Sequence, residues 1–174
     1  MKKTKSKRVT QNWSKKVMGK QKKKIVVAVS GGFDPVHIGH VRMFNEAKKL
    51  GHKLVVILNN DHWLRLKKGY VFMTETERKE IIESFSSVDE VVISSHTENT
   101  TDISICNDLK KVRPHIFAKG GDRHSGNIPE TPVCEEIGCA IVNDVGRGGK
   151  VQSSSWLVAN AKEKEAQLKK KANK

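Results

Sequence analysis

The stretch that decides the fold is Gly31-Gly32-Phe33-Asp34-Pro35-Val36-His37-Ile38-Gly39-His40, which follows the apolar run Ile25-Val26-Val27-Ala28-Val29 and leads into a helical pattern. Two adjacent glycines allow a positive φ and bring backbone amides close to a ligand. The helix that follows has unpaired N–H groups and a partial positive charge at its start, both of which suit an anion. A strand, a glycine turn and a helix start in this order predict a phosphate-binding site.

Two histidines stand at the helix end of this turn. His37 and His40 lie three residues apart around the first helical turn, so their imidazoles are expected to project to the same side. Each imidazole can donate a hydrogen bond or carry a proton near neutral pH, and a pair can stabilise charge that builds on a phosphate. A capping or metal-binding pair is the alternative, although no clear third ligand stands nearby. Asp34 is expected to bond to amides one or two residues on and fix the turn.

Apolar runs and helical patterns alternate along the rest of the chain. The apolar runs predict buried strands at residues 25–30, 53–58, 88–94, 115–118 and 139–142. Helices are expected over the apolar positions from Met43 to Leu50, from the capping box of Thr74 and Glu77 onward, from Ile105 to Val112, from Thr131-Pro132 to Gly138, and from Ser153 to about Lys170. Residues 59–72 are polar and basic and are interpreted as a loop. The alternation predicts an α/β fold, a Rossmann-like doubly wound parallel five-stranded sheet with flanking helices, whose ligands gather at the carboxyl ends of its strands.

Positive charge is concentrated at the two ends of the 174-residue chain, whose formal net charge is +14. Residues 1–24 hold eleven Lys or Arg and no acidic residue, and residues 162–174 hold six Lys against two Glu. These surpluses of eleven and four leave residues 25–161 at about −1. We therefore expect a basic, flexible arm at residues 1–24, one folded domain at residues 25–161, and the basic end of the last helix with a tail at residues 162–174.

Three further motifs stand at predicted strand and helix ends. They are Thr74-Glu75-Thr76-Glu77-Arg78-Lys79, Lys119-Gly120-Gly121-Asp122 and Ser153-Ser154-Ser155. With the histidine turn they resemble, in order and approximate spacing over residues 25–160, the motifs of the His-x-Gly-His nucleotidyltransferase superfamily, most closely its cytidylyltransferase-like branch. That branch includes glycerol-3-phosphate cytidylyltransferase and heptose-phosphate adenylyltransferase. The serine motif departs from the family pattern, because relatives usually have a Gly before a Ser-Thr-Thr core.

The resemblance implies a role for each motif. His37, His40, Lys68 and Arg78 would act in catalysis. The nucleotide would be bound by Gly31, Gly32, Phe33, Asp34, Gly39, Lys119, Gly120, Gly121, Asp122, Ser153, Ser154 and Ser155. Mg²⁺ is expected to be held mainly by the triphosphate, with no metal ligand on the protein. Structural roles stay open beside these: a solvated Lys68, a surface Arg78 and a serine cluster that caps a helix.

The expected reaction is transfer of CMP or AMP from a nucleoside triphosphate to a small phosphomonoester such as glycerol 3-phosphate or a sugar phosphate, with release of pyrophosphate. The nearest alternative is a coenzyme-type adenylyltransferase for nicotinamide mononucleotide, flavin or pantetheine phosphate. A rival from another class is a nucleic-acid-binding protein that uses the basic arm at residues 1–24. A third possibility is that this arm binds an anionic membrane surface. Homodimers are common in the resembling families.

The three cysteines and the hydropathy of the chain bear on its compartment. Cys106, Cys134 and Cys139 lack the spacing of a zinc or redox motif, which favours reduced thiols. No apolar run approaches the length of a membrane span or of a secretory signal. The sequence therefore predicts a soluble, cytoplasmic enzyme.

Overall fold

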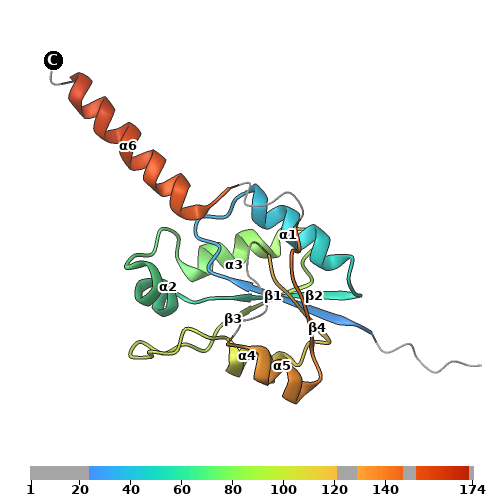
Figure 1. Ribbon diagram of the computed structural model, residues 1–174. Helices are drawn as coiled ribbons and strands as arrows, with labels where there is room; N and C mark the ends of the chain where they lie inside the picture. The colour runs from blue at the N-terminus through green and yellow to red at the C-terminus, as the bar shows by residue number, and fades with distance from the viewer. Residues whose placement is uncertain (1–23, 121–128, 147–151, 173–174) are drawn as a thin grey trace, which may run out of the picture.

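The computed structural model describes residues 24–120, 129–146 and 152–172 (Figure 1). In these ranges the strands are β1 (Val26–Gly31), β2 (Lys53–Leu58), β3 (Glu90–Ile93), β4 (Ile116–Ala118) and β5 (Ala140–Val142). The helices are α1 (Ile38–Lys48), α2 (Asp61–Lys68), α3 (Glu75–Glu83), α4 (Cys106–Val112), α5 (Thr131–Ile137) and α6 (Ser154–Ala172). The predicted strands are all present, although β3, β4 and β5 are shorter than expected.

The described strands form one parallel sheet in the order β3-β2-β1-β4-β5. β1 pairs with β2 from Val26 opposite Lys53 to Gly31 opposite Leu58, and its other edge pairs with β4. The chain therefore builds the sheet outward from β1 in one direction, and then returns to build it in the other. This arrangement confirms the doubly wound fold and creates a topological switch point between β1 and β4, where ligands bind in such sheets.

Helices cover both faces of the sheet (Figure 1). The core beneath α1 and α3 contains Val27, Val29, Phe44, Ala47, Leu54, Val56 and Ile82. The core beneath α4 and α5 contains Ala28, Ile57, Leu109, Phe117 and Cys134. Successive residues of a strand point to opposite faces, so β1 and β2 supply both cores and have to be apolar at nearly every position. This requirement explains the continuous apolar runs in the sequence.

The segment at residues 59–72 differs from the expected loop, because it contains α2. The Asn60 side chain caps this helix by accepting a hydrogen bond from the Trp63 amide (2.9 Å), and Gly69 ends it at a φ of 79°. Only Leu64 of α2 is buried. The segment therefore lacks the repeated apolar positions that mark a helix in sequence. Lys68 projects from the last turn of a capped helix, not from a loop.

Two other helix starts can be compared with their predictions. Thr74 and Glu77 form the predicted capping box of α3, in which Ile82 is buried but Ile81 is 36% exposed. In α5 the N-cap position is Glu130, so Thr131 is the first helical residue and not the cap. The Thr131-Pro132 pair is typical of an N-cap followed by the first helical residue, so the cap expected at Thr131 was wrong by one residue, and no side chain caps this helix.

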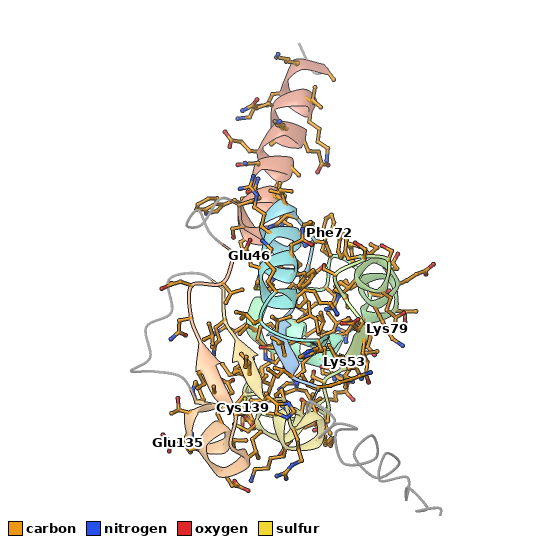
Figure 2. The ribbon with its side chains drawn as sticks, turned by 90° about the vertical axis from the view of Figure 1, so that its right-hand side faces the viewer. Glu46, Lys53, Phe72, Lys79, Glu135 and Cys139 are labelled. Atoms are coloured by element: carbon orange, nitrogen blue, oxygen red, sulfur yellow. The ribbon has the colours of Figure 1, made fainter. Side chains whose placement is uncertain are left out.

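The last helix, α6, projects away from the sheet (Figures 1 and 2). Its only buried residue is Val158, and residues 159–172 are all exposed. The predicted basic arm at residues 1–24 lies outside the described residues, apart from Lys24. Within the described ranges, no helix is both long and apolar enough to cross a membrane.

Candidate active site

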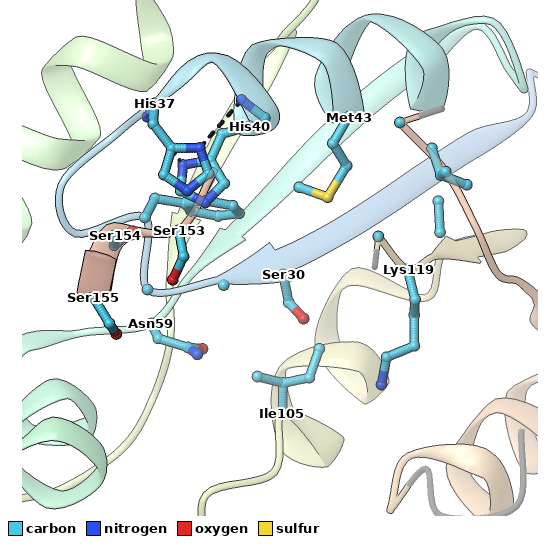
Figure 3. A pocket seen from close by; sticks show the side chains of 18 of the residues that line it. Ser30, His37, His40, Met43, Asn59, Ile105, Lys119, Ser153, Ser154 and Ser155 are labelled. Carbon is cyan, nitrogen blue, oxygen red and sulfur yellow. Dashed lines mark hydrogen bonds between the residues drawn. The ribbon is translucent and has the colours of Figure 1, made fainter. Parts of the chain in front are cut away.

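A cavity of about 560 Å³ opens at the carboxyl ends of β1 and β4 (Figure 3). The predicted site residues that line it are Gly31, Gly32, Phe33, His37, Gly39, His40, Lys68, Lys119, Gly120, Ser153, Ser154 and Ser155. Asp34 and Arg78 are not part of its wall, and Gly121 and Asp122 lie outside the described residues. The fold therefore gathers residues from three separate sequence motifs, and Lys68, around one space.

His37 and His40 form a reciprocal cap on the first turn of α1. The Gly39 amide donates to His37 Nδ1 (3.1 Å), and the His37 amide donates to His40 Nδ1 (3.3 Å). A ring nitrogen that accepts a hydrogen bond carries no proton, so in both neutral imidazoles the proton lies on Nε2. A Cβ at Gly39 would lie 3.0 Å from His37 Cε1, so a side chain at this position would require the His37 ring to shift. Each histidine thus keeps an Nε2–H donor beside the cavity.

The two imidazoles are uncharged at neutral pH. Burial, followed by the charges of His37 and Lys68, lowers the pKa of His40 to about 3. Burial also lowers the pKa of His37. A backbone hydrogen bond raises this pKa, and the charge of Lys68 lowers it, so that the net shift is downward. The rings are stacked with centroids 3.6 Å apart and planes 21° apart. Two positive charges at this separation would repel each other, so the pair serves as neutral hydrogen-bond donors.

The glycines of the turn are required by packing and not by a positive φ. A Cβ at Gly31 would lie 2.9 Å from the Phe33 ring, and a Cβ at Gly32 would lie 2.8 Å from Leu64 Cδ2. The left-handed residue of the turn is Phe33, with a φ of 48°. Its buried ring contacts the His40 ring edge to face, with centroids 4.9 Å apart. The expected positive φ at the glycine pair was therefore wrong, and Phe33 supports the histidine pair.

Asp34 connects the histidine turn to the segment before α3. Its fully buried carboxylate accepts hydrogen bonds from the amides of Phe72 (2.8 Å) and Met73 (2.7 Å). The prediction that it bonds to amides one or two residues on was wrong, because its acceptors are satisfied 38 and 39 residues away. The Asp34 carbonyl accepts a hydrogen bond from Lys68 Nζ (2.9 Å), which holds that lysine at the cavity wall.

Arg78 lies behind the cavity and is completely buried. Its guanidinium donates to the carbonyls of Gly32 (2.6 Å), Asn59 (2.7 Å) and Met73 (2.9 Å), and to Asp61 Oδ1 (2.6 Å). These bonds join the ends of β1 and β2 to α2 and to the start of α3. The surface alternative is therefore wrong, and these contacts let Arg78 position the segments around the cavity. Its expected role in catalysis stays a prediction.

The start of α6 meets the start of α1. Ser154 Oγ donates to the Pro35 carbonyl (2.9 Å), and the Leu157 amide donates to the Ser153 carbonyl (3.1 Å). Ser153, Ser154 and Ser155 lie beside His37 and His40 at the cavity (Figure 3). Two helix N-termini therefore converge on one space, which reinforces its preference for an anion.

Lys119 forms an ion pair at the β4 side of the cavity. Its Nζ lies 3.0 Å from Glu130 Oε2, and both side chains are only 9% exposed. The same Nζ lies 5.0 Å from the centroid of the Phe117 ring. Sequence reasoning missed Glu130, although its place directly before Thr131-Pro132 marks it as a residue at a helix start. The positive charge of Lys119 is therefore partly neutralised before any ligand binds.

Asn59 and Trp63 line the cavity at the β2 side and were also missed. Asn59 follows β2 directly, and a polar residue at the carboxyl end of a parallel strand is a signal that sequence reasoning could have used. Trp63 lies in α2, where a loop was expected. Trp63 stands beside Leu64 and Leu66, and nothing in the sequence sets it apart from them as a site residue.

Metal ligands are not clustered in the part of the chain that the structure describes: no group of three or more His, Cys, Asp or Glu side chains there could hold a metal ion. Glu130, a carboxylate in the cavity wall, is paired with Lys119. A Mg²⁺ held mainly by the triphosphate stays a prediction. The three cysteines, all described, are free thiols.

Comparisons with known proteins agree with this geometry. The model of the cytidylyltransferase-like family matches residues 28–141. An FAD synthase of Thermococcus kodakarensis is 36% identical over 107 residues, which cover 61% of this chain and 68% of that protein. The bifunctional protein HldE of Desulfatibacillum aliphaticivorans is 33% identical over 125 residues, which cover 71% of this chain and 24% of that protein. The chain thus spans about two thirds of the first relative and about a quarter of the second.

Among solved structures, the lipopolysaccharide core biosynthesis protein of Thermoplasma volcanium is similar with a TM-score of 0.57 and 26% identity. The similarity covers 72% of this chain and 99% of that protein. The resemblance seen in the motifs thus extends to the sheet and its connections. Since the family model covers well over half of the sequence, this chain belongs to the cytidylyltransferase-like family of nucleotidyltransferases.

Proposed function

We propose that this protein transfers a nucleoside monophosphate from a nucleoside triphosphate to a phosphomonoester. The observation that carries the proposal is the pair of neutral, stacked imidazoles at the start of α1, each with an Nε2–H donor at the cavity. Donors fixed at a helix N-terminus bind phosphate and stabilise the negative charge that develops on it during transfer.

The reaction is an in-line displacement at phosphorus. A phosphate oxygen of the acceptor attacks the α-phosphorus and forms a new P–O bond. The bond from the α-phosphorus to the oxygen bridging to the β-phosphate breaks, and its electron pair leaves with pyrophosphate. His37 and His40 donate to the α-phosphate oxygens as their negative charge rises, so no side chain has to act as a nucleophile.

Neutral histidines suit this role, because each donates through Nε2–H without changing its protonation state. Their donor function therefore does not vary across the neutral pH range. Lys68 supplies a positive charge on the α2 side of the cavity, next to the histidine turn. A Mg²⁺ bound to the triphosphate supplies charge neutralisation at its phosphates.

For the finer assignment we propose ATP as the donor and riboflavin 5′-phosphate as the acceptor, which gives FAD and pyrophosphate. The support is the similarity to an archaeal FAD synthase. A sugar phosphate is the second candidate acceptor. It is favoured by the similarity to HldE and by the Lys119-Gly120-Gly121-Asp122 motif, which resembles that of the heptose-phosphate adenylyltransferases.

Pyrophosphate release tests both levels of this proposal. The full-length protein is incubated with Mg²⁺ and either ATP or CTP, against riboflavin 5′-phosphate, sugar phosphates, glycerol 3-phosphate, nicotinamide mononucleotide and pantetheine phosphate. We expect pyrophosphate with ATP and riboflavin 5′-phosphate. Release with a different acceptor alone would correct the acceptor, and no release across the whole set would contradict nucleotidyl transfer itself.

A further inference from the structure

The β2 side of the cavity differs chemically from the phosphate-binding side. Besides Lys68, its described lining consists of Asn59, Trp63 and Ile103, together with Ile105, which lies between Asn59 and Lys119 (Figure 3). We call these four residues the β2-side wall. Three of these four side chains are apolar or aromatic, and Ile103 is 42% exposed. Single exposed apolar residues are common, but here one stands next to an indole at the rim of a ligand cavity.

The Trp63 indole is fixed in this wall from two directions. Its Nε1 donates to the Ile103 carbonyl (2.9 Å), which joins α2 to the segment before α4. The indole also lies against the turn after β1, because a Cβ added to Gly32 would lie 3.4 Å from Trp63 Cζ3. A side chain held by a hydrogen bond and by packing loses little further freedom when a ligand binds, which favours its use as a preformed binding surface.

Asn59 provides a polar group without a partner at the base of the same wall. Its backbone is fixed, because its amide donates to the Gly31 carbonyl (2.9 Å) and its carbonyl accepts from Arg78 (2.7 Å). Its side-chain Oδ1 is buried and has no hydrogen-bond partner among the described residues. Figure 3 shows this amide at the cavity. Buried polar atoms are almost always paired in folded proteins, so a ligand group is expected to complete this one.

The wall fits an aromatic acceptor better than a sugar. A sugar presents hydroxyl groups all around its ring, and each of them loses a partner when it is buried against an apolar surface. The described β2-side wall offers one amide, whereas an indole and two isoleucines offer a broad apolar surface. The β4 side, with Lys119 and Gly120, is the part that the family resemblance assigns to the nucleotide, which leaves the β2 side for the acceptor.

We propose that Trp63 and Asn59 determine acceptor specificity: the Trp63 face stacks on a planar aromatic ring, and the Asn59 amide bonds to the polar chain that joins this ring to the acceptor's phosphate. The site then selects an aromatic phosphomonoester over a sugar phosphate. This inference rests on the proposed nucleotidyl transfer. It assigns the acceptor's ring to Trp63 and its polar chain to Asn59, while the histidine pair binds the α-phosphate of the donor.

Binding of riboflavin 5′-phosphate to the full-length protein tests the role of Trp63 without catalysis, because stacking on an indole quenches flavin fluorescence. Trp63→Leu should raise the dissociation constant by about 2- to 12-fold, the range expected for loss of one aromatic pair. Trp63→Phe should keep most of the affinity. Trp156→Leu is the matched control, because Trp156 is 49% exposed on α6 and does not line the cavity, and it should leave the dissociation constant unchanged.

Asn59→Leu tests the amide separately. Its side chain has no partner within the described residues, so its replacement should leave the thermal midpoint unchanged or raise it. The KM for riboflavin 5′-phosphate should rise about 2- to 12-fold, while the KM for ATP should stay the same. A fall in thermal stability without any change in the acceptor KM would contradict the assignment of Asn59.

The remaining outcomes separate this inference from the proposed function. Displacement of the flavin by adenosine would overturn the inference, because it would assign the wall to the nucleobase. Pyrophosphate release with a sugar phosphate, together with no flavin binding, would overturn the acceptor assignment and support nucleotidyl transfer. Flavin binding that depends on Trp63, without pyrophosphate release from any acceptor, would support the wall and contradict the proposed reaction.

Discussion

Replacement of Arg78 by Met should destabilise the fold strongly, because this guanidinium joins segments that carry the site. Its four hydrogen bonds hold two strand ends, α2 and the segment before α3 in place. Met has a similar volume and no donor, so the substitution leaves three carbonyls and the Asp61 carboxylate without this partner. Removal of one member of a buried ion pair costs about 3–5 kcal/mol. Asp61 is 16% exposed and can be partly rehydrated, which places the expected loss near the lower end, at ~3–4 kcal/mol.

Equilibrium urea unfolding, followed by circular dichroism, measures this loss directly. For a protein of this size it corresponds to a fall of ~6–16 °C in the thermal midpoint. Arg65→Met is the matched control, because Arg65 is exposed on α2, and it should change the free energy of unfolding by no more than about 0.5 kcal/mol.

Arg78→Lys distinguishes positioning from phosphate binding. Lys is a good phosphate ligand, but a single ammonium cannot reproduce the planar fork that contacts four acceptors here. We therefore expect Arg78→Lys to lose nearly as much stability as Arg78→Met. The reasoning is refuted if either variant unfolds like the unmodified protein and loses only turnover, since that result would make Arg78 a direct contact of the substrate.

Sequence patterns predicted the parts of the structure that depend on near neighbours. The β1 and β2 runs are apolar at nearly every position, because both faces of these strands are covered, and their limits were predicted to within a residue. The capping box of Thr74 and Glu77 needs only two residues three apart, and it forms as predicted. The motifs of the histidine turn, Lys119 and the serine cluster also come together, since each follows a strand or starts a helix.

The predictions that failed involve partners far apart in the sequence. Asp34 was expected to bond to nearby amides, and the structural alternative for Arg78 was a surface position. The donors to Asp34 lie up to 39 residues away, and the acceptors of the buried Arg78 lie up to 46 residues away. No periodic pattern encodes such a pair, since neither residue is unusual in its own segment. Asn59 was missed although its place at a strand end is a signal, and the contacts that fix it, with Arg78 and the cavity, are visible only in the fold.

The protonation of the histidines provides the remaining tests. His37→Ala and His40→Ala each remove an Nε2–H donor from the cavity. Pyrophosphate release should fall ~10²–10³-fold in each variant, and a smaller loss in a well-folded variant would contradict the donor role. A chain without residues 1–24 should keep transfer activity, because β1 begins only at Val26. Any binding to RNA or DNA should disappear with this basic arm. The pKa of His40 is about 3 in the folded protein, whereas an ordinary histidine has a pKa of 6.5. Between these two pH values the unfolded chain protonates this residue and the folded protein does not. The free energy of unfolding is therefore fully retained above about pH 6.5 and falls as the pH drops through this window. Urea unfolding at about pH 7.5 and about pH 5 should show a larger fall for the unmodified protein than for His40→Gln, and equal falls would refute a buried, neutral His40.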